Sequence, residues 1–212
     1  MKSFFVVLGA LALVSLGLRL MLWLVARGMG GFVARWIGKS ALDQQPDAIH
    51  LDDCGAGAWS HFETANDLVS SLKRAGFADA GTYRIREFPV VMQLLVNEPD
   101  GLYAVVYEHP ENGHWIDVVA RFADGTASTW TTSAETGLDD RPGFPVIHAP
   151  GTQPWELVAR ARIERAGEPL RPVTRASVVP DFETAYAESI ARRKGRGVSA
   201  AEVGRVAQKR AA

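Results

Sequence analysis

The chain contains a single cysteine, Cys54, among its 212 residues. One cysteine excludes an intrachain disulfide and any metal site that requires two thiolates. It fits a reducing compartment and argues against a small secreted scaffold held together by disulfides. The sequence also lacks a Walker A loop, a GxGxxG turn, an HExxH pair and a GxSxG elbow, so these motifs predict no cofactor.

Acidic residues are absent from residues 1–39, which carry a formal charge of +5, whereas residues 40–159 carry −12 and residues 160–212 carry +6. An acidic central region lacks the basic surface of a nucleic-acid-binding protein, so no nucleic-acid partner is expected. The C-terminal region contains a basic cluster that can contact an anionic membrane surface, and its alternative is a solvated helix end. The cluster consists of Arg192, Arg193, Lys194 and Arg196.

A long apolar stretch runs from Phe4 to Ala26 and is interrupted only by Ser15 and Arg19. About twenty helical residues cross a hydrocarbon layer of about 30 Å, so the stretch predicts a transmembrane helix. A cleaved signal peptide is the alternative, since Lys2 supplies a basic start. However, the apolar run is longer than a usual signal core and no small-residue cleavage site follows it. We therefore expect an uncleaved single-pass anchor, with the lipid bilayer as a partner.

Cationic and aromatic residues near the end of this stretch are those expected at a membrane interface. They are Arg19, Trp23, Arg27, Arg35, Trp36 and Lys39. Because most flanking Lys and Arg residues follow the span, the positive-inside rule favours a cell (inner) membrane protein with its soluble domain in the cytoplasm. The extracytoplasmic side is the alternative.

The remaining chain is long enough for one sizeable domain. We divide it into an anchor with a basic juxtamembrane segment (1–39), a linker (40–50), a globular domain (51–180) and basic C-terminal helices (181–212). Hydrophobic periodicity and turn residues predict an α+β fold, with an antiparallel β-meander of four to five strands packed against helices. The expected strands are 82–88, 90–96, 102–108, 115–122 and 126–132, with a short one at 144–148. The expected helices are 62–75, 152–166 and 181–194, and the capping box of Ser199 and Glu202 opens a last short helix.

Cys54 is a candidate nucleophile, because a cysteine before a helix can be activated by the helix dipole and a histidine. Asp53-Cys54-Gly55, followed far downstream by Gly113-His114, resembles small papain-like hydrolases of the cell wall, and the resemblance is confined to these residues. It implies a cysteine-dependent hydrolase that uses Cys54 with a histidine, His114 or His148. A structural or solvent-facing cysteine is the alternative.

A set of potential metal ligands occurs at residues 50–54, with His61 and Glu63 beyond, but its spacing matches no standard metal site. His109 and His114 flank a turn, where histidines are usually exposed. The sequence therefore predicts neither a metal nor a catalytic residue, and favours a non-enzymatic binding or assembly module. It resembles anchored bacterial proteins in general organisation, and a membrane protein is a further potential partner. The loop 133–151 and the tryptophans Trp115 and Trp130 are candidate contacts, with core packing expected for at least one tryptophan.

Overall fold

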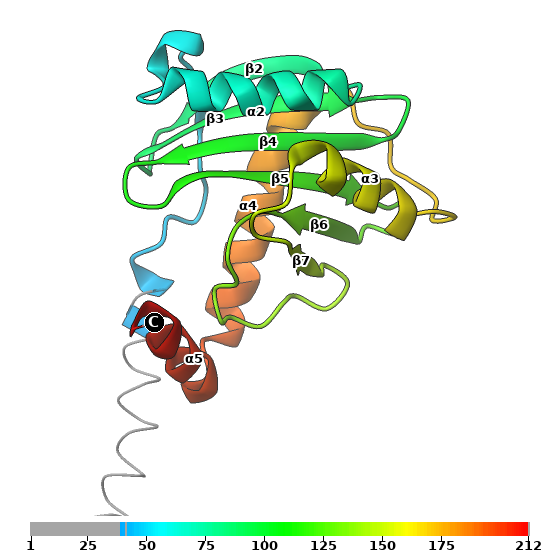
Figure 1. Ribbon diagram of the computed structural model, residues 1–212. Coiled ribbons are helices and arrows are strands. Elements are labelled where there is room, and N and C mark those ends of the chain that lie inside the picture. Colours follow the sequence, from blue (N-terminus) through cyan, green and yellow to red (C-terminus); the bar gives the residue numbers. More distant parts are fainter. Residues whose placement is uncertain (1–38, 41, 212) are drawn as a thin grey trace, which may run out of the picture. The chain divides into compact units, whose positions relative to one another are not determined.

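The structure is a computed structural model that describes residues 39–40 and 42–211 (Figure 1). The predicted span Phe4–Ala26 lies outside these residues, as do Arg19, Trp23, Arg27, Arg35 and Trp36. No helix within the described ranges is long and apolar enough to span a bilayer. The chain forms two compact units. One is residues 45–192, and the other joins the described residues before Gln45 to those from Arg193 on.

A seven-stranded sheet is the centre of the larger unit, and its strands lie side by side in sequence order. Neighbouring strands are antiparallel except for the last pair, β6 and β7, which is parallel. The strands are β1 (Leu51–Asp53), β2 (Ala78–Ile85), β3 (Val90–Asn97), β4 (Leu102–His109), β5 (Gly113–Arg121), β6 (Ala127–Thr131) and β7 (Val146–His148).

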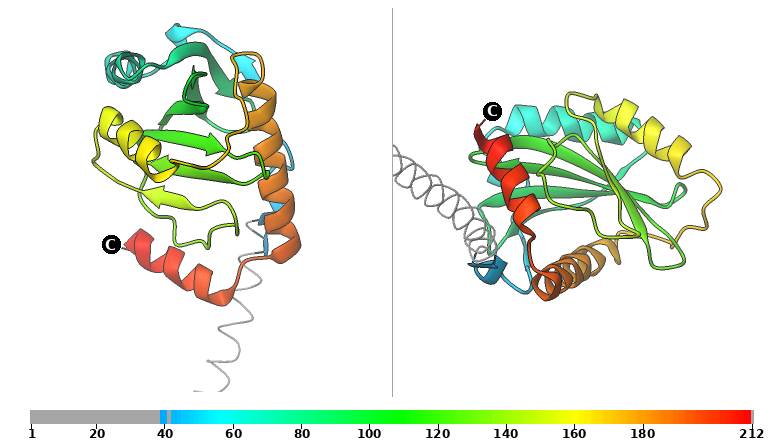
Figure 2. Two further views of the ribbon diagram at one scale, coloured as in Figure 1. Left: turned by 90° about the vertical axis from the view of Figure 1, so that its right-hand side faces the viewer. Right: turned by 90° about the horizontal axis from the view of Figure 1, so that it is seen from below.

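Both faces of the sheet are covered, because β3 and β4 are apolar on both sides. Helices α2 (Phe62–Arg74) and α3 (Pro154–Glu164) pack on one face, around fully buried residues such as Leu72 and Leu157. Helix α4 (Val178–Arg196) lies along the other face, where Val178 and Phe182 pack against strand residues (Figure 2). Burying each large aliphatic side chain contributes about 1.5–3 kcal/mol, so both layers stabilise the sheet.

Local signals account for the helix ends. Helix α2 is followed by Gly76 at φ +97°, a conformation that favours glycine. Helix α3 is capped by reciprocal bonds between Gln153 and Glu156, one residue after the start of the helix expected at 152–166. Helix α5 (Ala200–Ala211) begins with the predicted capping box, in which the Ser199 backbone N–H donates to Glu202 and the Glu202 N–H donates to the Ser199 hydroxyl. The chain also forms a short 3-10 helix, η1 (Ala56–Ala58).

The predicted α+β class is confirmed, but the sheet has more strands than the four to five expected. Strand β1 is too short and polar to show a period, and it exists because Leu51 pairs with Ile85 of β2. Strand β7 lies within the short strand expected at 144–148, but it pairs in parallel with β6. Strand β2 starts at Ala78, four residues before the predicted strand, and continues through a bulge between Asp79 and Gly81. Tertiary pairing, not local pattern, defines β1, the start of β2 and the parallel pairing of β7.

Candidate metal centre

Glu108 and His114 form a cross-strand pair in the hairpin of β4 and β5. Strict alternation along each strand places them on the face that carries α2 and α3, together with Val106 and Ile116. Residues directly opposite each other on one face have Cβ atoms about 4.5–5.5 Å apart. The hairpin register therefore holds a carboxylate and an imidazole against each other.

His61 reaches the same place from a different element, because it is the N-cap residue of α2. Its backbone N–H donates to Glu108 Oε1 at 2.8 Å, and the Ser60 N–H donates to Glu108 Oε2 at 2.7 Å. These amides belong to the start of the helix, where a negative charge is favourable. A side chain from the sheet thus satisfies the helix N-terminus and fixes its position above β4.

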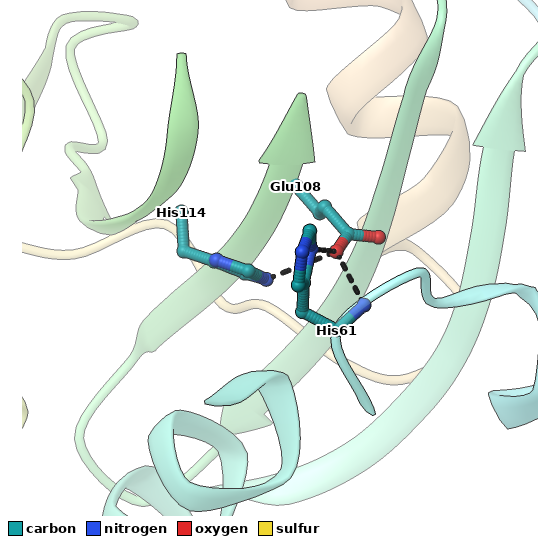
Figure 3. A group of neighbouring side chains, drawn as sticks. All are labelled: His61, Glu108 and His114. Carbon is teal, nitrogen blue, oxygen red and sulfur yellow. Dashed lines mark hydrogen bonds and ion pairs between the residues drawn. The ribbon is translucent and has the colours of Figure 1, made fainter. Parts of the chain in front are cut away.

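The three side chains converge on one oxygen atom (Figure 3). His61 Nδ1 lies 3.0 Å and His114 Nε2 lies 3.2 Å from Glu108 Oε1. One ligand atom from each residue lies within 4.8 Å of those of the other two. Around a tetrahedral zinc ion with bonds of about 2.0–2.2 Å, ligand atoms are about 3.4 Å apart. The two distances to the carboxylate are already close to that value.

Burial differs among the three residues. The Glu108 side chain is 6% exposed, that of His114 is 13% and that of His61 is 74%. The His114 Nε2 atom is buried and makes no hydrogen bond within the described part of the chain. Trp59 lies beside it, with ring centroids 6.5 Å apart. The cluster therefore has a buried floor and a solvent-facing side formed by His61, so an ion could enter.

Glu108 is held in its charged form. Burial raises the pKa of this carboxyl, but the N–H groups of Ser60 and His61, the His61 ring and the charge of His114 outweigh it, so the pKa lies below its ordinary value. An ionised carboxylate can bind a cation without first losing a proton. If no cation is bound, protonation of His61 or His114 is the alternative source of a positive charge beside Glu108.

The donor set indicates which cations fit. Mg²⁺ and Ca²⁺ prefer oxygen ligands alone, whereas two imidazoles with one carboxylate suit zinc and other divalent transition metals. Three protein ligands leave further coordination positions for water. The residues present therefore fit a transition-metal ion with an open position.

The sequence did not predict this cluster, although two of its three residues had a local signal. The turn between β4 and β5 places His109 opposite Gly113, so the preceding Glu108 must lie opposite His114. That pairing could have been derived from the hairpin alone. No sequence pattern shows that His61, 47 residues before Glu108, approaches the hairpin. Neither His50 nor Glu63, also considered as ligands, belongs to the cluster.

Cys54 has different surroundings. Its thiol donates to the Thr82 carbonyl at 3.6 Å, and within the described residues it makes no hydrogen bond or ion pair with a histidine. Burial raises the pKa of this thiol, although Arg84 opposes the effect. A raised pKa disfavours the thiolate that a nucleophile needs. The structure thus brings His114 to Glu108 and His61, and does not pair it with Cys54.

His148, the third catalytic candidate, lies on β7, where its Nδ1 is 3.0 Å from the Ser133 carbonyl. Its neighbour in register is Thr131, which hydrogen-bonds to Asp117. Burial raises the pKa of Asp117 to about 6, against hydrogen bonds from Thr131 and Tyr107 and the charge of His148. This group is a second polar cluster, separate from the candidate metal centre.

The other candidate contacts divide between core and surface. Trp130 is 2% exposed and its indole N–H donates to Glu164 at 2.6 Å, so it is a core residue. Trp115 stacks on Tyr107, with centroids 4.6 Å apart. Helix α4 ends with four cationic residues, which the negative end of the helix dipole stabilises. They are Arg192, Arg193, Lys194 and Arg196. Lys39 is exposed.

Comparisons with protein-family models, curated proteins and solved structures found no match, so the function must be inferred from the chain's own geometry.

Proposed function

We propose that this protein is a membrane-anchored binding module whose α+β domain holds one divalent transition-metal ion, with zinc as the test case, between His61, Glu108 and His114. The observation that carries the proposal is the convergence of two histidine nitrogens on Glu108 Oε1, at 3.0 and 3.2 Å. A buried carboxylate that faces an imidazole nitrogen without a hydrogen bond has both the charge and the lone pairs that a metal ion requires.

The assigned role is binding, not catalysis. A metal-dependent hydrolase commonly needs a general base or acid beside its metal-bound water. Glu108 is the only carboxylate of the cluster, and both of its oxygens already accept backbone N–H groups. As a metal ligand it cannot also serve as the base. The bound ion would join the start of α2 to the β4–β5 hairpin.

The membrane anchor is the second part of the proposal and comes from the sequence. Phe4–Ala26 has the length and apolar character of a single bilayer span, and the basic residues after it favour a cytoplasmic domain. Resistance of the full-length protein to alkaline carbonate extraction tests the anchor. Release of the protein by carbonate would contradict it.

Zinc titration of the full-length protein in mild detergent tests the metal centre. The protein should carry a purification tag without histidine and should first be treated with a chelator. We expect one zinc ion per chain by calorimetry and by elemental analysis. His114→Ala and Glu108→Gln should each weaken binding at least about tenfold, as the loss of a metal-site residue does.

His109→Ala is the matched control, because His109 belongs to the same hairpin but not to the cluster. Its ring accepts hydrogen bonds from Glu111 and Asn112 at the exposed turn. This variant should bind zinc as the native protein does. Equal losses in the His109 and His114 variants would show nonspecific binding and contradict the proposal.

A further inference from the structure

The smaller unit contains a cavity of about 490 Å³ where Lys39, Leu42 and Asp43 meet the end of α4 and the start of α5. Three cationic side chains line it, Lys39, Lys194 and Arg196, against two acidic ones, Asp43 and Glu202. Leu42 contributes an apolar wall and is 8% exposed. Lys39 and Lys194, which are about 150 residues apart in the sequence, therefore bring basic groups to one cavity.

Glu202 does not oppose a bound anion, because its carboxylate is neutralised within the fold. It is 1% exposed, accepts the Ser199 N–H at 2.8 Å and forms an ion pair with Arg196 at 2.5 Å. These contacts also hold the Arg196 side chain at the cavity. The other charged side chains among the described residues that line it are two cations, Lys39 and Lys194, and one carboxylate, Asp43.

The rim is open where two glycines replace side chains. Gly195 and Gly197 line the cavity, and a Cβ added at either would meet no atom of the described residues within 4 Å. Gly197 also has φ +75°, which permits the turn between α4 and α5. A ligand group can thus approach without displacing a side chain at these two positions.

The position of Lys39 in the chain indicates the source of the anion. Lys39 follows the apolar stretch, which ends at Ala26, by 13 residues. Such a connection reaches at most about 45 Å, so lipid headgroups are within its range. Lys and Arg near an anionic leaflet are attracted to its lipids. This step rests on the membrane anchor proposed above and is independent of the metal centre.

We propose that this cavity binds the phosphate group of an anionic membrane lipid, with Lys39 and Lys194 as the principal contacts. The proposal differs from a general attraction of the basic tail to membranes, because it assigns the effect to residues that line the cavity. Arg192 and Arg193 are adjacent on α4 but do not line it. They supply a control with the same loss of charge.

Native mass spectrometry of the full-length protein in detergent tests this proposal, with phosphatidylglycerol and phosphatidylcholine as probes. We expect one phosphatidylglycerol to be retained preferentially. Lys39→Ala with Lys194→Ala should weaken retention at least about tenfold, while Arg192→Ala with Arg193→Ala should change it less than threefold. Circular dichroism should show unchanged helix content in both, and Lys39→Gln with Lys194→Gln should reproduce the loss.

Three results would overturn the proposal: equal losses in both double variants, no preference for the anionic lipid, or displacement of the lipid by equimolar inorganic phosphate. The last would identify a site for free phosphate. Failure of the anchor is distinguishable, because carbonate would then release a protein that still retains phosphatidylglycerol. An anchored protein that retains none would overturn the cavity proposal alone.

Discussion

Two carboxyl groups inside this domain have pKa values that are shifted in opposite directions. Glu108 has a pKa below its ordinary value, because the surrounding N–H groups and histidines outweigh burial. Asp117 is on the opposite face of the sheet, in register with Val105, and its pKa is raised to about 6, because burial outweighs its hydrogen bonds. Glu108 is therefore ionised and can bind a cation. The ionised form of Asp117 lowers the stability of the fold at neutral pH.

The Asp117 shift predicts how stability depends on pH. The folded pKa is about 6 and the ordinary value is 3.8, so the folded state binds the proton more tightly. The contribution to stability is therefore complete below pH 3.8 and is lost as the pH rises to 6. Across this window the native protein should lose about 1–3 kcal/mol relative to Asp117→Asn. Chemical unfolding of both proteins at pH 4 and pH 7 measures the difference, and parallel stability curves would refute it.

Among the elements, turns show how local geometry and tertiary packing combine. Gly101 lies between β3 and β4 at φ +62°, and an added Cβ would lie 2.9 Å from Leu170 Cδ1. Gly125 lies between β5 and β6 at φ +87°, with nothing within 4 Å of its added Cβ. Both positions require the left-handed conformation, but only the first is crowded.

Alanine substitutions at these glycines should separate the two effects. Gly125→Ala should cost about 1–2 kcal/mol, the penalty for a left-handed residue. Gly101→Ala should cost about 2–4 kcal/mol, because overpacking against Leu170 is added. Urea unfolding of the detergent-solubilised protein gives both values. If Gly101→Ala and Gly125→Ala lower stability equally, the Leu170 side chain yields to the added methyl group. The extra cost expected from overpacking at Gly101 would then be wrong.

The elements also show what the sequence can predict. Strands β3 to β6 and helix α2 were placed within a few residues, because long apolar runs and Asn-Gly or Asp-Gly turns define them locally. The pairing of β1, the parallel addition of β7 and the approach of His61 to the hairpin depend on contacts distant in sequence. The Glu108–His114 pair was predictable from the turn, whereas the third ligand was not.

At the scale of the whole molecule, charge is segregated along the chain. The first 39 residues carry +5, residues 40–159 carry −12 and residues 160–212 carry +6. Lys39 and Lys194, one from each basic region of the sequence, line one cavity in the smaller unit. The acidic middle part contains the candidate metal centre. This distribution fits a protein whose basic part contacts a membrane and whose acidic part attracts cations.

Labelling of Cys54 tests the orientation proposed for the anchor. Cys54 is the only cysteine and is partly exposed, so a membrane-impermeant maleimide reports its side of the membrane. We expect labelling only after the inner membrane is permeabilised, because the basic residues after the predicted span favour a cytoplasmic domain. Labelling in cells with only the outer barrier opened would reverse this orientation. A C-terminal reporter fusion provides an independent control.

The most direct test of the metal centre is zinc K-edge X-ray absorption of the zinc-loaded full-length protein. The account predicts nitrogen and oxygen ligands at about 2.0–2.1 Å, with outer-shell scattering from two imidazoles, and no sulfur at about 2.3 Å. The imidazole signal should fall by half in His114→Ala and remain unchanged in His109→Ala. A sulfur ligand would place the ion at Cys54, and an all-oxygen shell would exclude both histidines. Either result would contradict a centre formed by His61, Glu108 and His114.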